Sequence, residues 1–476
     1  MLKQTFAADT KSIVPANTRP GIILFITCIA VFMSGLDLFI VNVALSNIGQ
    51  SIGNSSLSDL SWVLNGYAIF FAALLVPAGR MADRLGQKNS FIAGMFLFTA
   101  ASLGAALSGS LWMLILFRCI QAVGAAILTP SSLGLLLASM PPERRTSSVR
   151  IWASSGSFAA ALGPVIGGLL LEVSWSWIFV INLPIGLLAI LAAVKYFPAN
   201  QQRKDAVFPD LLGGLWLILA IGALSLGLVK GPDWGWAASE TLISFAAAAV
   251  AILLYVIRSA RHAAPIIDPS LLRNRVFVWS NLSVGLLSAA FAIELLSVIL
   301  FLQEAWGWSA LKTGLAIAPG PCMVFLFSAL AQRLSKRMPA GFIAAAGALL
   351  IGIGPVLMLS AMGSASSFTG SILPGWMLIG IGYGLALPTM ISSAASDLAP
   401  HLTSTGSAVV NMSRQIGTVL GTSLLVIVLT MASENSGYQS YIPVWWAAGA
   451  VSLLSVITAL GISARKNSLE PKTRLG

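Results

Sequence analysis

Long apolar runs alternate with short polar connections along most of this chain. The first, Gly21 to Leu45, contains a single acid, Asp37. A run of roughly 20 apolar residues is long enough to cross a bilayer as a helix. Windows of about 19 residues give fourteen such runs, centred near residues 33, 70, 98, 125, 160, 187, 219, 248, 289, 323, 351, 383, 418 and 453. The pattern predicts an all-α polytopic membrane protein with fourteen transmembrane helices.

The composition agrees with this membrane prediction. Hydrophobic residues make up 57% of the 476 positions, charged residues 9%, and the mean hydropathy is +0.89. Soluble domains carry about 25% charged residues, so a soluble globular protein is excluded. The three cysteines, Cys28, Cys119 and Cys322, lie inside apolar runs and are expected to pack rather than to form disulfides or bind metal. The N-terminus lacks the features of a removable signal peptide, so the first span is expected to serve as its own signal.

The basic residues are distributed unevenly between the two sides of the predicted membrane. If the N-terminus is cytoplasmic, only Lys230 and Lys312 of the 27 lysines and arginines fall on the opposite side, and Arg118 and Arg414 lie within spans. Cytoplasmic loops of membrane proteins are enriched in Lys and Arg. The net charge of +11 therefore indicates membrane topology, with both termini cytoplasmic, and not a nucleic-acid surface.

Spans 1–6 and 9–14 form two similar halves, with spans 7 and 8 inserted between them. Internal repeats are typical of secondary transporters, whose binding site lies near the middle of the membrane between the repeats. The predicted organisation is a cytoplasmic tail (1–18), an N-terminal six-helix bundle (19–200), an inserted two-helix segment with its flanking loops (201–275), a C-terminal six-helix bundle (276–465) and a second cytoplasmic tail (466–476).

The connection after the second span, on the predicted cytoplasmic side, places the acid Asp83 among basic residues between two glycines. Two glycines allow a tight turn, and an acid among bases can form contacts with neighbouring helix ends. An ordinary basic loop is the alternative. The candidate gate residues are Gly79, Asp83, Arg84, Gly86 and Lys88.

Arg118 lies in the fourth span. A charged residue within a span is costly and seldom faces lipid, and Gln121 is on the same helical face because it follows three residues later. The alternative is an arginine that extends toward the cytoplasmic membrane surface. A carboxylate near the middle of a span costs about 2.5–3.5 kcal/mol to insert, so Asp37 is the first candidate for binding a proton or a cation.

The fifth span contains Gly163, Pro164, Gly167 and Gly168. Small residues four apart let two helices approach closely, and a proline inside a helix removes a hydrogen bond and bends it. A plain tight helix crossing explains the residues equally well.

Glu294 lies in the ninth span, the first of the second half. Glu294 and Asp37 both lie roughly 24–26 Å along their spans, at 1.5 Å per residue. The two carboxylates are therefore predicted to face one cavity. Phe291 and Phe301 flank Glu294 at helical spacing and would suit a lipophilic cation. The alternative is a glutamate at the membrane interface.

Four further candidates for lining the cavity are Asn42, Trp62, Tyr67 and Gln121, although structural roles explain Trp62 and Tyr67 equally well. The sequence has no Walker loop for ATP, and His262 and His401 lie apart from any cysteine. Neither a metal, nor a cofactor, nor an enzymatic activity is expected.

These motifs resemble those of the major facilitator superfamily. The loop from Gly79 to Lys88 is similar to G-x-x-x-D-R-x-G-x-K, which steadies one state of the cytoplasmic gate in that superfamily. The run from Arg118 to Ala126 resembles R-x-x-Q-G-x-G-A-A, with Ala122 in place of a glycine. The run from Ala159 to Gly168 resembles the exporters' motif G-x-x-x-G-P-x-x-G-G, with Ala159 in place of the first glycine.

Residues 36–45 are similar to the L-D-x-T-I-V-N-V-A-L signature of the fourteen-span drug:proton antiporters, with Phe39 in place of threonine. Residues 175–186 and 411–417 fit the same family, so the resemblance covers essentially the whole chain. It implies a major facilitator fold of two six-helix bundles plus two inserted helices that rock about a central site. It also implies a prokaryotic inner membrane, a monomer and a proton-coupling role for Arg118.

The sequence and the resemblance together predict proton-driven export of lipophilic compounds, with cations as the expected substrates. Asp37 would hold either a proton or the positive charge of the substrate, because burial favours a neutral carboxyl. Protonation from outside would release the drug, and Arg118 would help to discharge the proton to the cytoplasm. The alternatives are a transporter of another solute class (a metabolite, siderophore or amino acid) on the same scaffold, which the two buried acids disfavour for anions, and a non-transporting membrane sensor.

Overall fold

The computed structural model describes residues 19–53, 55–198, 208–362, 367–396, 398, 402–432 and 437–462, without the side chains of residues 146, 403 and 404. Over these residues the chain is helical and contains no strand, and fourteen helical segments are long and apolar enough to cross a membrane. The predicted all-α, fourteen-span fold is confirmed. The predicted tails (1–18 and 466–476) and His401 lie outside the described residues.

The helices follow one another with short connections. In chain order they are α1 (Pro20–Ser51), α2 (Leu57–Leu85), α3 (Gln87–Ala106), α4 (Leu111–Ser139), α5 (Pro142–Leu171), α6 (Trp177–Val180), α7 (Asn182–Tyr196), α8 (Leu211–Trp234), α9 (Ser239–Arg261), α10 (Pro269–Arg273), α11 (Arg275–Leu300), the π-helix η1 (Phe301–Ala305), α12 (Ala310–Ile317), α13 (Pro319–Leu334), α14 (Ala340–Ser360), the π-helix η2 (Phe368–Ile372), α15 (Leu373–Ser396), α16 (Thr403–Met431), the 3₁₀-helix η3 (Gly437–Tyr441) and α17 (Ile442–Ile462).

Local sequence explains where several of these helices begin and end. Ser56 caps α2 by accepting a hydrogen bond from the backbone N of Asp59 at 3.2 Å, and Asn274 caps α11 by accepting one from the N of Phe277 at 3.1 Å. Such caps satisfy backbone donors that the first helical turn leaves free. Gly86 alone separates α2 from α3, with φ of 94°, a conformation that favours glycine.

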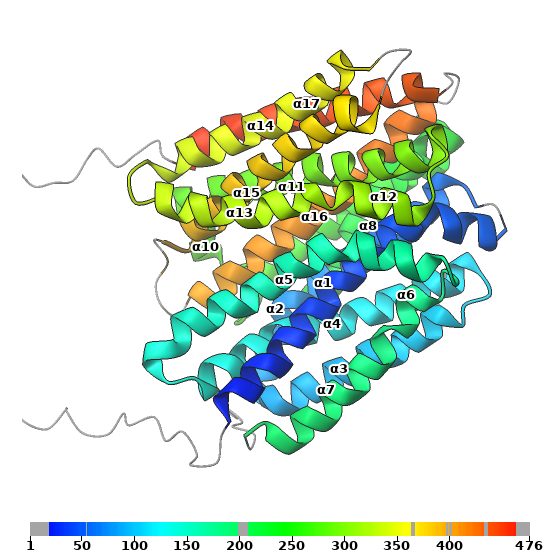
Figure 1. The fold of residues 1–476 in the computed structure, drawn as a ribbon. Coiled ribbons are helices and arrows are strands. Elements are labelled where there is room, and N and C mark those ends of the chain that lie inside the picture. Colours follow the sequence, from blue (N-terminus) through cyan, green and yellow to red (C-terminus); the bar gives the residue numbers. More distant parts are fainter. Residues whose placement is uncertain are drawn as a thin grey trace, which may run out of the picture.

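The helices form two halves, with one inserted helix packed between them (Figure 1). In the N-terminal half, α1 packs against α4, α5 and α7. In the C-terminal half, α11 packs in the same way against α15, α16 and α17. The inserted helix α8 packs against α2 of one half and α16 of the other, and α9 packs on α8. The fold of two six-helix halves plus an inserted pair is therefore confirmed.

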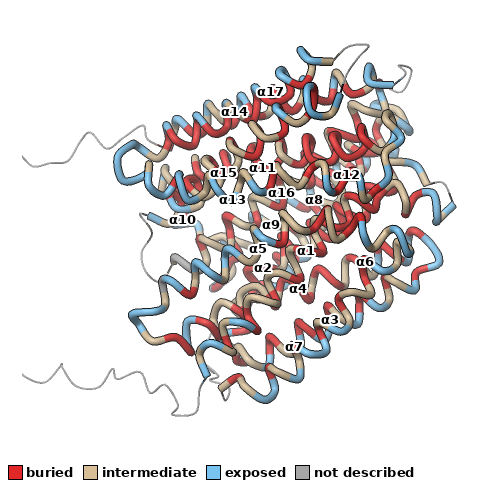
Figure 2. The backbone as a smooth tube through the Cα atoms, in the orientation of Figure 1, coloured by how far each residue is buried: buried red, intermediate tan, exposed pale blue. Residues whose placement is uncertain are grey.

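Burial is concentrated where the halves meet and along the middle of each half (Figure 2). Within the central windows of the spans, 83% of the residues are buried in both α2 and the α11–η1 span, against 22% in α9. Helices α2 and α11 therefore lie inside the protein, whereas α9 lies at its periphery.

The bundle has two ends. We call the end at which α1 begins and α17 ends the termini side, and the other the opposite side. Near the opposite side, Gln303 Nε2 of η1 donates to the backbone O of Val43 of α1 at 3.0 Å, and Ser46 Oγ donates to Glu304 Oε1 at 3.4 Å. The first residues of α12 also pack closely against Gly168 of α5. The two halves are thus in contact at the opposite side.

Candidate functional site

Asp37 of α1 and Arg118 of α4 form an ion pair inside the N-terminal half. Arg118 Nη1 donates to Asp37 Oδ2, and neither side chain is accessible to solvent. Arg118 Nε also donates to the backbone O of Val63 of α2 at 3.3 Å. The arginine therefore lies inside the helix bundle and does not extend to a membrane surface.

Two amide side chains complete the hydrogen bonding of the Asp37 carboxylate. Gln121 Nε2 of α4 donates to Asp37 Oδ1 at 2.8 Å, and Asn182 Nδ2, at the start of α7, donates to the same oxygen at 3.3 Å. The same two nitrogens also lie 2.9 and 3.3 Å from Ser102 Oγ of α3. One carboxylate thus joins α1, α4 and α7, with α3 as a further support.

Aromatic rings enclose the guanidinium of Arg118. Its Cζ lies 4.3 Å from the ring centre of Tyr67 and 5.9 Å from that of Phe179. Cations are attracted to the faces of such rings. Arg118 Nη2 and Asn182 Oδ1 are buried and have no hydrogen-bond partner among the described residues. The network therefore retains one free donor and one free acceptor.

This arrangement has two chemical consequences. A buried ion pair is tolerated only when good geometry and further hydrogen bonds offset the desolvation of both charges, and here Gln121 and Asn182 supply those bonds. A proton on Asp37 would remove the attraction to Arg118 and leave a cation among rings and amides. The net charge of the pair therefore changes from zero to +1 when a single proton binds Asp37.

Glu294 of α11 lies in the other half and is equally buried, with 1% of its surface exposed. Neither carboxylate oxygen has a hydrogen-bond partner among the described residues, and no described ion pair includes it. Asp37 follows the start of α1 by about 17 residues and Glu294 follows the start of α11 by about 19, a difference of roughly 3 Å along the two axes.

The structure does not bring Asp37 and Glu294 together. Every described side-chain partner of Asp37 belongs to the N-terminal half. On α11, Glu294 lies between Phe291, which stacks on Tyr383 of α15, and Ser297, which accepts a hydrogen bond from Trp445 of α17. Because residues three apart share a helix face, Glu294 faces the interior of its own half. A cavity shared by the two acids gains no support from this arrangement.

The aromatic residues predicted beside Glu294 lie in different surroundings. Phe291 stacks on Tyr383 with ring centres 4.1 Å apart and on Trp376 at 6.2 Å, and it is only partly buried. Phe301 is fully buried at the start of η1, with ring centres 5.1 to 5.3 Å from Trp306, Tyr441 and Trp445. Phe291 can therefore border a binding site, whereas Phe301 is part of the packing near the opposite side.

The other cavity candidates lie in the N-terminal half. Asn42 Nδ2 donates to the backbone O of Leu38 in its own helix at 2.9 Å, and Trp62 is partly buried against the core. Tyr67 is buried against Arg118. Of these three residues, only Tyr67 joins the network around Asp37.

The residues predicted as a gate loop lie almost entirely within helices: Gly79, Asp83 and Arg84 in α2 and Lys88 in α3, with Gly86 alone between them. The predicted turn bracketed by two glycines is therefore wrong, because Gly79 lies inside α2. The segment, which we still call the gate loop, connects α2 and α3 to α7. Lys88 Nζ donates to the backbone O of Val194 at 2.9 Å and of Phe197 at 3.0 Å, at the end of α7. Gln87 Nε2 donates to Asp83 Oδ1 at 2.8 Å, and the Arg84 guanidinium lies 5.6 Å from the ring centre of Phe208. The loop thus fixes the termini-side ends of several helices.

The glycines of α5 lie where helices cross closely. A Cβ atom at Gly163 would lie 2.7 Å from Cβ of Phe39, and one at Gly167 would lie 2.8 Å from Cγ1 of Ile40, both on α1. A Cβ atom at Gly168 would lie 2.6 Å from Cα of Leu311 on α12, in the other half. Pro164 lies within the same helix. The glycines of α5 therefore allow close helix packing both within the N-terminal half and between the two halves.

The sequence model described as Major Facilitator Superfamily matches residues 27–422. The chain therefore belongs to the Major Facilitator Superfamily. It is a multi-pass membrane transporter of that superfamily, as the sequence resemblance predicted.

Several relatives in the superfamily are named for drug resistance. The chain is 31% identical over 468 residues to the methylenomycin A resistance protein of Bacillus subtilis, covering 96% of each chain. It is 30% identical to the tetracenomycin C resistance and export protein of Streptomyces glaucescens, covering 86% of this chain and 76% of the relative. It is also 30% identical to the probable multidrug resistance protein EmrY of Escherichia coli, covering 88% and 82%.

Solved structures of the superfamily share the fold. A crystal structure of the peptide transporter POT in complex with sulfate matches with a TM-score of 0.65 and 17% identity, covering 92% of this chain and 94% of that one. A POT family transporter in complex with 5-aminolevulinic acid matches with a TM-score of 0.66 and 16% identity, covering 93% and 96%. At this identity the likeness concerns the fold alone.

Three residues of the network were not among the sequence candidates: Ser102, Phe179 and Asn182. Asn182 offered a signal, because an amide inside an apolar run requires a buried partner. Ser102 offered little, because a serine in a membrane helix commonly bonds to its own backbone, as Ser102 also does to the O of Phe98 at 2.8 Å.

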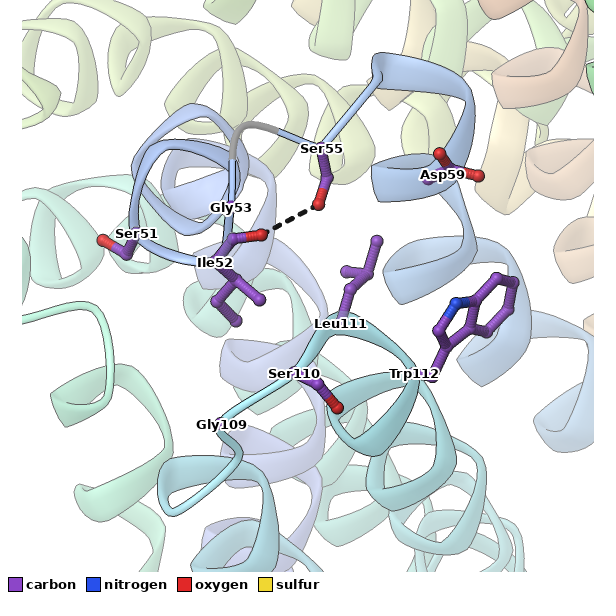
Figure 3. A pocket seen from close by; sticks show the side chains of 9 residues that line it. All are labelled: Ser51, Ile52, Gly53, Ser55, Asp59, Gly109, Ser110, Leu111 and Trp112. Carbon is purple, nitrogen blue, oxygen red and sulfur yellow. Dashed lines mark hydrogen bonds between the residues drawn. The ribbon is translucent and has the colours of Figure 1, made fainter.

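A surface recess of about 450 Å³ lies on the opposite side of the transporter, between the end of α1, the start of α2 and the start of α4 (Figure 3). Asp59 and Trp112 line it, together with residues such as Ser51, Ser55 and Ser110. It does not include Asp37 or Glu294. In the part of the chain that the structure describes, no group of three or more His, Cys, Asp and Glu side chains could hold a metal ion.

Proposed function

We propose that this transporter is a proton-coupled exporter of lipophilic drugs or biocides, with cations as favoured substrates. It would work by alternating access in a prokaryotic cytoplasmic membrane, as a monomer with both termini in the cytoplasm. The drug-resistance names of its relatives support export. The basic residues of the termini-side loops support the orientation. The observation that carries the coupling is the buried pair of Asp37 and Arg118.

The Asp37–Arg118 pair and the contact between the halves suggest which step of the transport cycle the described conformation represents. The halves are in contact at the opposite side, which is the outer side in the proposed orientation. Asp37 is engaged by Arg118 and two amides, which stabilise its charged form. We therefore assign this conformation to the state after the proton has left for the cytoplasm and before the drug binds.

The remaining steps follow from the charge balance. The drug enters from the cytoplasmic side, and the halves rock until the site opens outward. A proton from outside then binds Asp37 and removes its attraction to Arg118, which loosens α1 from α4 and favours release of the drug. After the return to the inward state, Arg118 pairs with Asp37 again and displaces the proton into the cytoplasm.

In this proposal, the three predicted segments 19–200, 201–275 and 276–465 are the parts that move relative to one another. The loop from Gly79 to Lys88 would steady the cytoplasmic gate, and the glycines of α5 would let the outer side close tightly. The contacts of Lys88 with the end of α7 support the first role, and the close approach of Gly168 to Leu311 supports the second.

Reconstitution into liposomes tests the proposal. Purified protein is exposed to an imposed inward-directed proton gradient and a fluorescent lipophilic cation, and the native protein is compared with Asp37→Asn. We expect gradient-driven transport by the native protein and its loss in the variant. Asp59→Asn is the matched control, because Asp59 also lies in a membrane helix but pairs with Lys230 near the outer surface.

The outcomes separate the parts of the proposal. Transport that persists in Asp37→Asn would overturn the role of Asp37. A native protein that ignores the cation but moves a neutral or anionic solute would replace the drug assignment with that solute class. Native transport without any dependence on the proton gradient would remove proton coupling.

A further inference from the structure

We propose that Glu294 is a second proton site, which holds a proton in the described state and exchanges it for the charge of a bound cation. This inference rests on the proposed export of lipophilic cations. It assigns the two acids different tasks: Asp37 couples transport to the proton gradient, and Glu294 balances the charge of the drug.

The surroundings of Glu294 indicate that its carboxyl group holds a proton in the described state. The side chain is buried, and neither carboxylate oxygen has a partner among the described residues. An ionised carboxylate buried without a partner costs many kcal/mol, so such a group is stable as the neutral acid. Asp37 differs, because Arg118, Gln121 and Asn182 all donate to it.

The charged and titratable groups on the helices around α11 form no described ion pair with Glu294. Tyr383 of α15 stacks on Phe291, and Tyr441 at the start of the α17 span donates to Glu304 at 3.2 Å. Asp37 of α1 is paired with Arg118. Helix α14 carries no charged residue, and Arg275 lies about 29 Å down the axis of α11.

Arg414 of α16 has an electrostatic interaction with Tyr383, which stacks on Phe291, and no described ion pair joins it to Glu294. Helix α16 crosses α11 where Gly417 and Gly421 pack against Gly285 and Ala289. Nine residues separate Gly285 from Glu294, which at about 100° per residue places them on opposite sides of the helix. The main crossing of α16 thus lies away from Glu294, and no described ion pair or hydrogen bond includes the Glu294 carboxylate.

The neighbouring aromatic rings indicate what would displace the proton. Phe291 lies one helical turn from Glu294 and stacks on Tyr383 and Trp376. Ring faces attract cations, and Phe291 is partly accessible. A lipophilic cation on these rings would stabilise the ionised form of Glu294. The O–H bond of the carboxyl then breaks, and the proton passes to cytoplasmic water while the drug charge takes its place.

Proton release on drug binding tests the inference directly. Tetraphenylphosphonium, a lipophilic cation, is added to detergent-solubilised protein in a weakly buffered solution. A pH indicator measures the protons released, and tryptophan fluorescence measures binding of the cation. We expect the native protein to release about one proton for each cation bound, and Glu294→Gln to release none. Glu304→Gln is the matched control on the same span, because Glu304 already has hydrogen-bond partners in Ser46 and Tyr441.

The pH dependence of binding gives a second measurement. Because the cation displaces a proton, its affinity should rise with pH by up to tenfold per unit, and this dependence should disappear in Glu294→Gln. Glu294→Asp, which keeps the acid, should retain both signals and guards against loss of folding. Cation binding by the native protein without proton release, release that persists in Glu294→Gln, or no binding of the cation would each overturn the inference. The liposome assay with Asp37→Asn reports separately on proton coupling.

Discussion

Gln121 Nε2 lies 2.8 Å from Oδ1 of Asp37, and Gln121 Oε1 accepts a hydrogen bond from Arg118 Nη1 at 2.7 Å. One amide thus contacts both members of the ion pair. Because Gln121 and Arg118 lie on the same helix three residues apart, the amide fixes the direction in which the guanidinium reaches α1. The ion pair and Gln121 therefore act as one unit.

Removal of one charge should destabilise the protein more than removal of both. Arg118→Leu leaves Asp37 buried without its counter-ion, and breaking such a pair costs about 3–5 kcal/mol. The double variant Arg118→Leu, Asp37→Leu leaves no buried charge there and should regain most of the stability, but not proton-driven transport. Thermal unfolding in detergent measures the first effect and liposome transport the second. A double variant as unstable as Arg118→Leu would contradict the prediction.

The contact between α5 and α12 should control closure at the opposite side. A Cβ atom at Gly168 would lie 2.6 Å from the backbone Cα of Leu311, which cannot rotate away as a side chain can. Gly168→Ala should therefore shift the protein toward states open at this side. Gly222→Ala is the matched control, because a Cβ atom at Gly222 would meet no atom within 4 Å.

Labelling measures this shift. Ser46 lies at the same closed region and donates a hydrogen bond to Glu304. In a protein whose native cysteines are replaced, Ser46→Cys introduces a thiol there. The rate at which a membrane-impermeant thiol reagent labels it reports how often this region opens. Labelling should be several-fold faster with Gly168→Ala and unchanged with Gly222→Ala. Equal labelling in both backgrounds would show that Gly168 does not limit closure.

Sequence reasoning singled out Asp37 and Arg118 as candidates, because the cost of charge in a membrane allows few explanations for either residue. It did not identify their partnership or the contribution of Asn182. Helix number and length follow from apolar runs, but the direction in which a buried side chain points depends on which helices pack around it. Glu294 illustrates this limit. Matched depth predicts that it faces Asp37, but the contacts described for its neighbours Phe291 and Ser297 are with α15 and α17 of its own half.

The gate loop should stabilise the end of α7 through Lys88. Its Nζ donates to two carbonyl groups, those of Val194 and Phe197, which the helix itself leaves free. Lys88→Met keeps most of the apolar stem and should lose about 1 kcal/mol of stability. Hydrogen exchange of amides at the end of α7 should become faster, while exchange near Asp37 stays the same. Unchanged exchange at the end of α7 would contradict the role of Lys88.

The inserted helix pair should move with the N-terminal half. Helix α8 contacts α2 near the opposite side, where Lys230 Nζ lies 2.7 Å from Asp59 Oδ1. Near the middle of α8, Asn65 Nδ2 of α2 donates to Ser225 Oγ at 3.4 Å. Near the termini side, Arg80 of α2 donates to the backbone O of Ala264, just after α9. Toward α16, the hydrogen bond described is between Ser225 and Ser423, 2.9 Å apart. When the halves rock, the contact with α16 should break and those with α2 should persist.

Two crosslinks that share one residue test this motion. In a protein without Cys28, Cys119 and Cys322, the pair Asn65→Cys and Ser225→Cys joins α8 to α2, and the pair Ser225→Cys and Ser423→Cys joins α8 to α16. We expect the first crosslink to leave at least half of the liposome transport, and the second to abolish it until a reductant is added. Because both pairs include position 225, a defect caused by that substitution alone would appear in both reduced proteins. Inhibition by the first crosslink and activity with the second would show instead that α8 moves with the C-terminal half.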